Sequence, residues 1–542
     1  MPTLHWVGKE KVVNHHHEVP FRLLDKQYSF AANEGTPANS SGNRIIHGDN
    51  LEALKSLLPE FEGRVNCIYI DPPYNTGNEG WVYNDNVSDP KIKKWLGQVV
   101  GKEGEDLSRH DKWLCMMYPR LKLLHRLLAD DGVMLMSLDF NEHRYAEVML
   151  DEIFGATNRI ETVVWKKSYG GGSKAKHIVN LHEYVICFAK NKSRIGVIEL
   201  PPNEDVLKYY KFKDTKFDLR GPYRLQPLAT NSMDERPNLR YPIVHMGEEI
   251  WPEKQWQWSS ERALLAYAND EIEVKKVRGR WSVNYKQYLR DEDGEDRGSK
   301  LYSIVDSVYT QHGTNEIKLM FGDGKTFDFP KPSDLITKFL QAFTKTDSLV
   351  LDSFAGSGTT PHAVLKLNAQ DKGNRRFIVC EMMDYAETIT AERVRRVMNG
   401  YGEGVKAVPG TGGGFDFYTV GPCLFDEDQR LNEEVGESAI RDYVAYTEGI
   451  QPEHRWGTDN PVSRYALGAS ETAMWLFLYE RSRVTSLDMD FLGSLNLKAH
   501  LAAGNTRPEQ FIVYADKCAL DADFLFQHGI TFKRIPRDIT KF

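Results

Sequence analysis

Short apolar runs alternate with segments of helical spacing along two stretches of the chain, residues 43–194 and 325–400. The runs have the length and the β-branched content typical of buried strands, and the segments between them carry apolar residues three and four positions apart. The predicted strands are 44–47, 65–70, 133–138, 160–165, 183–189, 348–351 and 377–380, and the predicted helices are 51–58, 108–129, 141–154, 333–344 and 361–367. This alternation predicts an α/β fold with a largely parallel sheet.

The chain ends show weaker patterns. Residues 1–42 are polar and irregular. Gly410–Gly414 is typical of a flexible link, and residues 415–542 after it have a mixed α/β pattern. Helices are predicted there at 436–447 and 470–482, and strands at 510–514 and 530–535. This last region carries no catalytic constellation, which favours a structural or partner-binding role.

Composition narrows the class of protein. The 542 residues carry a net charge of −8, so a nucleic-acid surface has to be a local basic patch. Six scattered cysteines without a C-x-x-C pair indicate reduced thiols in a cytoplasmic protein. No signal peptide opens the chain, and no apolar run is long enough to cross a membrane. Three consecutive histidines, His15–His17, cannot converge on one ion, so no metal site is predicted.

Residues 195–318 interleave basic and aromatic side chains with little periodicity. Such a mixture suits a nucleic-acid surface, because cations neutralise phosphates and rings stack or pack. Acids also occur at 291–296, so an ordinary loop-rich insertion with solvated charges stays an alternative. The candidate DNA-binding residues in this region are Arg224, Arg240, Arg278 and Arg280.

Two loops near the predicted sheet have further candidate chemistry. Residues 78–107 are rich in Gly, Asn and Asp and contain Trp81 and Tyr83, as in a lid or a DNA-contacting segment. Residues 166–177 are rich in Gly and Lys and suit a mobile loop near phosphate. The candidate phosphate contacts there are Lys166, Lys167 and Lys174.

The strand at 65–70 ends in Asp71-Pro72-Pro73-Tyr74. The two prolines fix the backbone and remove two donors, so neither helix nor ladder continues. An acid and a ring are therefore displayed at the carboxyl end of a strand, where α/β sheets bind ligands. Asp71 can accept hydrogen bonds from an amino group, and Tyr74 can stack on a base taken out of its helix. The alternative is a strand-ending turn with a surface acid.

The strand at 348–351 leads through Asp352-Ser-Phe354-Ala-Gly356-Ser-Gly358-Thr359 into a helix. Glycines let the backbone approach a ligand, and a helix N-terminus presents free amides. Neither Gly-Lys-Ser/Thr nor a third glycine follows, so the pattern is not a phosphate loop or a full dinucleotide motif. The next strand ends in Glu381, an acid placed to bind ribose hydroxyls.

Asp49 and Asn50 follow the strand at 44–47 and lie beside the position where Asp71 emerges. Both a ligand-binding role and simple capping of the helix that follows are open.

These motifs together resemble a known family. The cofactor half of an S-adenosylmethionine methyltransferase resembles the unit formed here by a strand, a Gly loop, a helix, a second strand and Glu381. The sequence Asp71-Pro72-Pro73-Tyr74 resembles the catalytic turn of the amino-methylating branch of these enzymes. Because the catalytic turn comes first, the order is similar to the circularly permuted β group of DNA amino-methyltransferases. The start Trp6-Val-Gly-Lys-Glu10, the large insert and the end Phe532–Asp538 further resemble Mod subunits of Type III restriction–modification systems.

The resemblance implies a Rossmann-like fold with an inserted target-recognition domain and a small C-terminal α/β domain. The implied domains are 1–42 (extension), 43–194 (catalytic half), 195–318 (target recognition), 319–410 (cofactor half) and 411–542 (C-terminal domain). Asp71, Pro72, Pro73 and Tyr74 would hold the target base. The implied cofactor-binding residues are Asp49, Asn50, Lys331, Pro332, Asp352, Phe354, Gly356, Gly358, Thr359 and Glu381.

The function implied is methyl transfer from S-adenosylmethionine to the N6 amino group of a flipped adenine in duplex DNA. In the family an acid-headed turn usually goes with adenine, so Asp71 favours adenine and leaves cytosine N4 open. RNA as substrate, and a DNA-binding specificity subunit without activity, stay open as well. The Type III resemblance implies a homodimer and a separate restriction subunit carrying ATPase and nuclease motifs, whereas an orphan methyltransferase would need no such partner.

Overall fold

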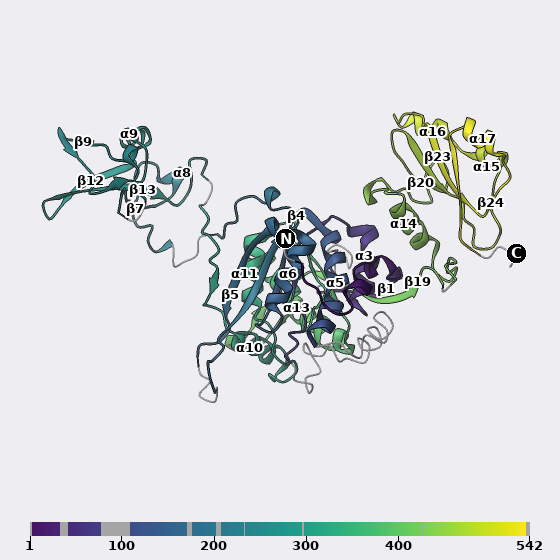
Figure 1. Cartoon of the computed structure of the whole chain (residues 1–542), viewed down its shortest axis with the longest axis horizontal. Coiled ribbons are helices and arrows are strands. Elements are labelled where there is room, and N and C mark those ends of the chain that lie inside the picture. The colour runs from purple at the N-terminus through teal and green to yellow at the C-terminus, as the bar shows by residue number, and fades with distance from the viewer. Residues whose placement is uncertain are drawn as a thin grey trace. The chain divides into compact units, whose positions relative to one another are not determined.

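The computed structural model describes residues 3–32, 42–76, 109–170, 176–201, 207–231, 234–294, 297–426 and 428–537. The chain forms two compact units, one of residues 1–196 with 302–542 and one of residues 197–301. Figure 1 shows their elements along the chain. The smaller unit lies inside the range 195–318 that the sequence marks out as an insert, and residues 302–318 belong to the larger unit.

A mixed sheet organises the larger unit, and among the described residues it has ten strands. In spatial order these are β1 (Arg22–Ala31), β19 (Gly414–Cys423), β2 (Arg44–His47), β16 (Arg376–Glu381), β15 (Leu349–Asp352), β3 (Val65–Ile70), β4 (Leu128–Leu138), β6 (His182–Ala189), β5 (Arg159–Lys166) and β14 (Ile304–Val305). The strands from β19 to β4 run parallel, whereas β1 and β6 run antiparallel to their neighbours. The predicted α/β fold with a largely parallel sheet is confirmed.

The sheet brings together strands that are far apart in the sequence. β3 pairs with β15 through Cys67 with Val350 and Ile68 with Leu351. Because the two strands are parallel, the turn after β3 and the loop after β15 leave the sheet at the same edge. β2 and β16 end at this edge too, with His47 opposite Glu381.

Helices cover both faces of the central strands. On one face lie α3 (Asn50–Phe61), α5 (Arg109–Leu127) and α6 (His143–Phe154), whose apolar residues share one buried cluster with Ile68 and Ile70 of β3. Cys67 and Tyr69 point to the opposite face, since side chains alternate along a strand. Three further helices follow, α11 (Ser333–Phe343), α12 (Thr359–Asp371) and α13 (Glu392–Asn399). α12 packs against both α11 and α13, and α11 contacts β3. No helix among the described residues is both long and apolar enough to span a membrane.

The ends of the chain depart from the sequence prediction in two places. Residues 1–42, expected to be irregular, contain α1 (Lys9–Val12), α2 (His15–Glu18) and β1. β1 pairs with β19, so Gly410–Gly414 leads into the main sheet and not into a separate body. An edge strand needs only one apolar side and few buried residues, which explains why the pattern of β1 is weak.

The C-terminal residues form a second sheet of β20 (Ala466–Ala469), β21 (Ala473–Phe477), β23 (Gln510–Ala515) and β25 (Ile530–Arg534), preceded by α14 (Glu437–Thr447). The predicted helix at 470–482 is wrong, because β21 occupies its apolar part. A short apolar run fits a buried strand as well as a helix, and pairing with β20 and β23 decides for the strand. Short elements α15 (Met489–Ser494), α16 (Leu497–Ala502) and α17 (Ala522–Gln527) complete this region.

The smaller unit is built on an antiparallel sheet of β7 (Tyr223–Pro227), β13 (Arg280–Tyr288) and β12 (Ile272–Val277). A second hairpin consists of β9 (Ile243–His245) and β10 (Glu248–Ile250), and β8 (Ala229–Thr230) pairs with β11 (Gln255–Trp256). With α9 (Ser260–Ala268), these strands enclose a small core that includes Leu228, Trp256 and Val283. This regular structure is what the irregular sequence pattern of the insert did not reveal.

Candidate active site

The Asp71–Tyr74 turn follows β3 and is held by hydrogen bonds to residues elsewhere in the chain. Trp113 of α5 donates its indole N–H to the Pro73 carbonyl over 2.7 Å. Asn75, which follows the turn in a left-handed conformation with φ of 55°, donates its side-chain amide to the carbonyl of Arg109. The Pro72 carbonyl has no hydrogen-bond partner among the described residues. The turn is therefore rigid and still offers an unused acceptor.

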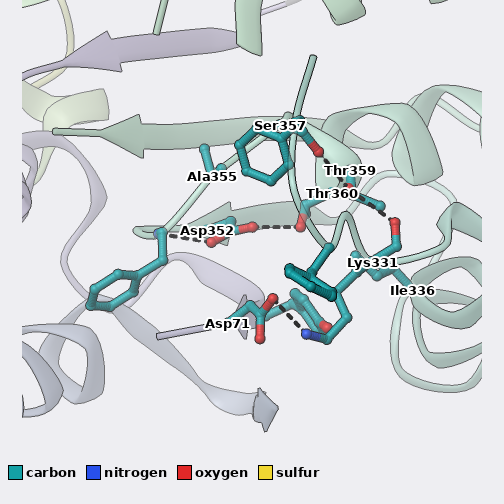
Figure 2. Close-up of a pocket in the computed structure, with 13 residues that line it drawn as sticks. Asp71, Lys331, Ile336, Asp352, Ala355, Ser357, Thr359 and Thr360 are labelled. Carbon is teal, nitrogen blue, oxygen red and sulfur yellow. Dashed lines mark hydrogen bonds and ion pairs between the residues drawn. The ribbon is translucent and has the colours of Figure 1, made fainter. Parts of the chain in front are cut away.

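Asp71 is held on one side only. The Lys331 ammonium, just before α11, lies 2.8 Å from Asp71 Oδ2 (Figure 2). The other oxygen, Oδ1, is buried and has no hydrogen-bond partner in the described part of the chain. Buried carboxylate oxygens are nearly always hydrogen-bonded in folded proteins. Oδ1 is therefore a prepared acceptor for a donor group of a ligand.

Glu183 joins Asp71 at this edge of the sheet. β6 runs antiparallel to β4, so its first residues lie beside the carboxyl ends of the parallel strands. Glu183 accepts hydrogen bonds from Tyr74 Oη at 3.1 Å and from Lys167 Nζ at 3.0 Å. Lys331 Nζ lies 3.7 Å from Glu183 and 4.7 Å from the Tyr74 ring centroid. We call Asp71, Tyr74, Lys167, Glu183 and Lys331 the Asp71 network.

The Asp71 network sets the ionisation of its members. Burial raises the pKa of the Asp71 carboxyl, and the negative charge of Glu183 adds to this rise while Lys331 opposes it. Burial also disfavours the charge of Glu183, but attraction to Lys331 and Lys167 outweighs burial and lowers the pKa of Glu183. For Lys331 burial is outweighed by Asp71 and Glu183, which raise its pKa. The attraction among opposite charges thus favours the charged forms of Lys331 and Glu183, whereas burial favours the neutral form of Asp71.

The loop after β15 is braced by the acid that ends the strand. Asp352 accepts the backbone N–H of Phe354 at 2.9 Å and the Thr360 hydroxyl at 2.5 Å (Figure 2). Burial raises the pKa of Asp352 to about 7, although both hydrogen bonds oppose that rise. Asp352, a predicted cofactor ligand, therefore has both oxygens committed to the shape of the loop.

The two glycines of this loop adopt left-handed backbone conformations, with φ of 53° at Gly356 and 80° at Gly358. The Gly356 N–H donates to Glu381 Oε2 at 2.8 Å, and Met383 N–H donates to Oε1 at 2.9 Å. A Cβ on Gly358 would lie 3.0 Å from the Thr390 carbonyl oxygen. Glu381 thus fixes the backbone of the loop through both of its carboxylate oxygens.

Asp49 and Asn50 connect the neighbouring strand end to this loop. Asp49 Oδ1 accepts from the backbone N–H of Leu51 at 2.8 Å, which is the capping contact left open by the sequence. Asn50 is buried and donates to the Ser353 carbonyl at 2.9 Å. The side-chain oxygen Oδ1 of Asn50 in turn accepts a hydrogen bond from Nε of the buried Arg120 of α5 at 2.6 Å. Asn50 therefore positions the Gly loop from behind.

One cleft joins the turn to the loop. It is lined by Tyr69, Asp71, Phe327, Phe329, Lys331, Ile336, Asp352, Phe354, Ala355, Gly356, Ser357, Thr359 and Thr360. Six predicted site residues are thus in the lining, namely Asp71, Lys331, Asp352, Phe354, Gly356 and Thr359. Pro332 instead caps the start of α11. The cleft offers an acid at one end and a Gly-rich backbone turn with aromatic neighbours at the other.

The candidate DNA-binding residues are dispersed. Lys166 ends β5, and Lys167 is committed to Glu183. Arg224 donates to Gln287 at 2.8 Å within the sheet of the smaller unit, and Arg240 is exposed. Arg278 and Arg280 lie at the tip of the β12–β13 hairpin. Lys174 and the predicted loop 78–107 lie outside the described residues.

Sequence reasoning missed Glu183, Trp113 and Arg120. Glu183 opens an otherwise apolar strand, a signal that the sequence does contain, but its value depends on the antiparallel direction of β6. Trp113 and Arg120 lie on the buried side of α5, where the helical pattern alone indicates core packing.

The sheet order and the cleft at its carboxyl edge define an α/β protein with a candidate ligand site where its parallel strands end. The family model N6_N4_Mtase, described as DNA methylase, matches residues 65–392. Because this match covers more than half of the chain, the protein belongs to that DNA methylase family.

Known relatives agree with this family. The chain is 32% identical to the Mod subunit of the Type III restriction-modification enzyme EcoPI from Escherichia phage P1 over 448 residues, 75% of this chain and 66% of the relative. It is 31% identical to the Type II methyltransferase M.KpnI from Klebsiella pneumoniae, over 64% of this chain and 82% of M.KpnI. A solved structure of TTHA0409, a DNA modification methylase from Thermus thermophilus in complex with S-adenosyl-L-methionine, matches 65% of this chain and 95% of that chain at 14% identity and a TM-score of 0.31. The chain thus spans slightly less than two thirds of the EcoPI Mod subunit.

Proposed function

We propose that the protein transfers a methyl group from S-adenosylmethionine to the N6 amino group of an adenine flipped out of duplex DNA. The observation that carries this proposal is the buried, unpartnered Oδ1 of Asp71 in a cleft whose far end is the Gly356–Gly358 loop. Membership of a DNA methylase family supports DNA as the substrate class.

The residues present fit the cofactor. When bound, S-adenosylmethionine supplies an electrophilic methyl group on a sulfonium sulfur. Phe354 and the backbone of Gly356 line the cleft where the methionine part would be held, and Glu381, the acid that ends β16, would accept hydrogen bonds from the ribose hydroxyls. Lys331 and Thr359 also line the cleft, and the Thr359 hydroxyl donates a hydrogen bond of 3.2 Å to the Lys331 carbonyl.

The Asp71–Tyr74 turn would position the base. An exocyclic amino group has two N–H bonds, and the turn offers it two acceptors that have no partner among the described residues, Asp71 Oδ1 and the Pro72 carbonyl. Accepting both hydrogen bonds would direct the amino nitrogen and increase its electron density, so that its lone pair could form the bond to the methyl carbon. The bond from that carbon to the sulfonium sulfur would break in the same step, the sulfur would leave as a neutral thioether, and one amino proton would pass to solvent. Tyr74, whose hydroxyl donates a hydrogen bond to Glu183, would stack on the ring.

The wider assembly is also part of the proposal. Similarity to a Mod subunit supports association with a separate restriction subunit. We propose in addition that the protein is a homodimer and acts in the cytoplasm. Similarity to a Type II methyltransferase supports independent action. We assign residues 195–318 to target recognition, residues 43–194 and 319–410 to the two halves of the catalytic domain, and residues 411–542 to a C-terminal domain.

The test is methyl transfer from a tritiated donor to duplex DNA, followed by nucleoside analysis. Wild type should yield N6-methyladenine, and Asp71→Ala should abolish transfer while binding the cofactor nearly as well as wild type. Asp347→Ala removes an exposed acid just before β15 and should behave like wild type. Transfer that survives Asp71→Ala refutes the role of the turn, and N4-methylcytosine as the product refutes adenine.

A further inference from the structure

The β12–β13 hairpin ends in a tight turn with an arginine at its tip. Val277 pairs with Arg280, which leaves a two-residue turn of Arg278 and Gly279. Both residues have positive φ, 49° and 79°, the conformation that matches the twist of a hairpin. The turn is therefore well defined, and it presents Arg278 to solvent.

The β9–β10 hairpin has the same design with an apolar tip. His245 pairs with Glu248 around a turn of Met246 and Gly247, again with positive φ of 53° and 82°. The Met246 side chain is 87% exposed. A methionine in a left-handed turn position gains nothing from packing when it is so exposed. The Met246 side chain is therefore available for contact with a partner.

The two hairpins are joined close to their tips. Glu248 accepts a hydrogen bond from the Trp281 indole at 2.8 Å and pairs with Lys276 at 3.5 Å. His245 lies edge-on against the Trp281 ring, with ring centroids 5.4 Å apart. Figure 1 shows both hairpins projecting from the same end of the smaller unit. Met246 and Arg278 thus belong to one surface.

Charge on this surface is only partly neutralised. Lys276 pairs with Glu248 and Lys275 pairs with Glu273. The exposed side chains of Arg278 and Arg280 have no hydrogen-bond or ion-pair partner in the described part of the chain. Val244 and Val277 are each 55% exposed beside them. We call Val244, Met246, Val277, Arg278 and Arg280 the hairpin tips.

We propose that the hairpin tips enter the major groove of duplex DNA and read base edges there. This inference rests on the proposed function. A two-stranded β-ribbon fits the major groove, where arginine pairs with guanine O6 and N7 and apolar side chains contact the thymine methyl group. Phosphate binding alone would call for the arginines but not for an exposed methionine and two valines. The hairpin tips therefore contribute to sequence specificity.

The experiment compares variants on the sequence that the wild type methylates, identified by single-molecule sequencing of host DNA. Arg278→Asn with Arg280→Gln removes both cations while keeping a residue that tolerates the left-handed turn. We expect kcat/KM on that duplex to fall by at least about 10- to 100-fold, since the loss of even one arginine–base contact costs about that factor. Cofactor binding, measured by calorimetry, should not change.

Matched variants separate charge from shape. Arg297→Gln removes an exposed arginine of the same unit away from the hairpin tips and should keep wild-type kcat/KM. Met246→Asp tolerates the turn but adds a negative charge, and it should weaken duplex binding far more than the neutral Met246→Asn.

The outcomes distinguish the two proposals. Wild type that binds cofactor but methylates no duplex refutes the proposed function. Wild type that methylates DNA, while the double arginine variant keeps both its rate and its recognition sequence, refutes the role of the hairpin tips alone. Unchanged methylation with lost binding of a restriction subunit would assign the tips to a protein partner and overturns the inference as well.

Discussion

Opposite pH responses are expected from two substitutions in the Asp71 network. Asp71 must be ionised to accept hydrogen bonds through Oδ1, so kcat/KM should fall as the pH drops through the pKa of Asp71. Lys331→Met removes the cation that opposes the rise in this pKa, so the acid limb should move to higher pH. Glu183→Gln removes the anion that adds to the rise, so the limb should move to lower pH.

The structure gives the size of these effects. Lys331 Nζ lies 2.8 Å from Asp71 and 3.7 Å from Glu183, so the distances together place the two carboxylates within about 6.5 Å. At an effective dielectric constant of about 20, charges at that distance interact by roughly 2.5 kcal/mol. Because about 1.4 kcal/mol corresponds to one pH unit, Glu183→Gln should move the limb by roughly one to two pH units. The shorter contact makes the effect of Lys331→Met larger.

The assay is single-turnover methyl transfer between pH 5 and 9 in about 0.1 M salt, with circular dichroism to confirm folding at each pH. Lys338→Met on α11 and Glu161→Gln on β5 make the same chemical changes outside the Asp71 network. Both controls should keep the wild-type profile. The ionisable neighbours Asp352 and Lys167 are present in both test variants, so the titration of Asp352, with a pKa of about 7, contributes to both profiles. If the acid limb moves in the same direction in Lys331→Met and Glu183→Gln, the electrostatic reasoning is refuted. The role of Lys331 and Glu183 would then be purely structural.

Three further predictions concern parts that hold the cleft. Gly358→Ala places a Cβ 3.0 Å from the Thr390 carbonyl oxygen at a φ of 80°, so the affinity for the cofactor, measured by calorimetry, should drop. The control Gly436→Ala adds a Cβ in open space and should leave that affinity unchanged. Trp113→Phe removes a hydrogen bond to the Asp71–Tyr74 turn worth about 1 kcal/mol, so kcat should fall severalfold with little change in cofactor KM. Arg393→Met removes a fully buried guanidinium paired with Glu316, and urea unfolding should show a loss of about 3–5 kcal/mol.

Much of the central sheet could be predicted because its strands are short, apolar and end at polar residues. The predicted strand at 65–70 coincides with β3, and the predicted strand at 377–380 lies inside β16. Asp71 and Glu381 were identified because each directly follows or ends such a strand. The helix at 470–482 failed because a short apolar run fits both structures and only neighbouring strands decide between them.

The rest of the site depends on strand direction, which a hydrophobic pattern does not contain. Had β6 run parallel to β4, its first residue would lie at the amino edge of the sheet, far from Asp71. Antiparallel pairing of Leu138 with Tyr184 instead sets Glu183 at the carboxyl edge. Lys331 was predicted as a cofactor contact, but it forms an ion pair with Asp71. It reaches Asp71 because β15 and α11 both pack beside β3. The electrostatic centre of the cleft is thus a product of sheet topology, assembled from four segments of the chain that carry no common motif.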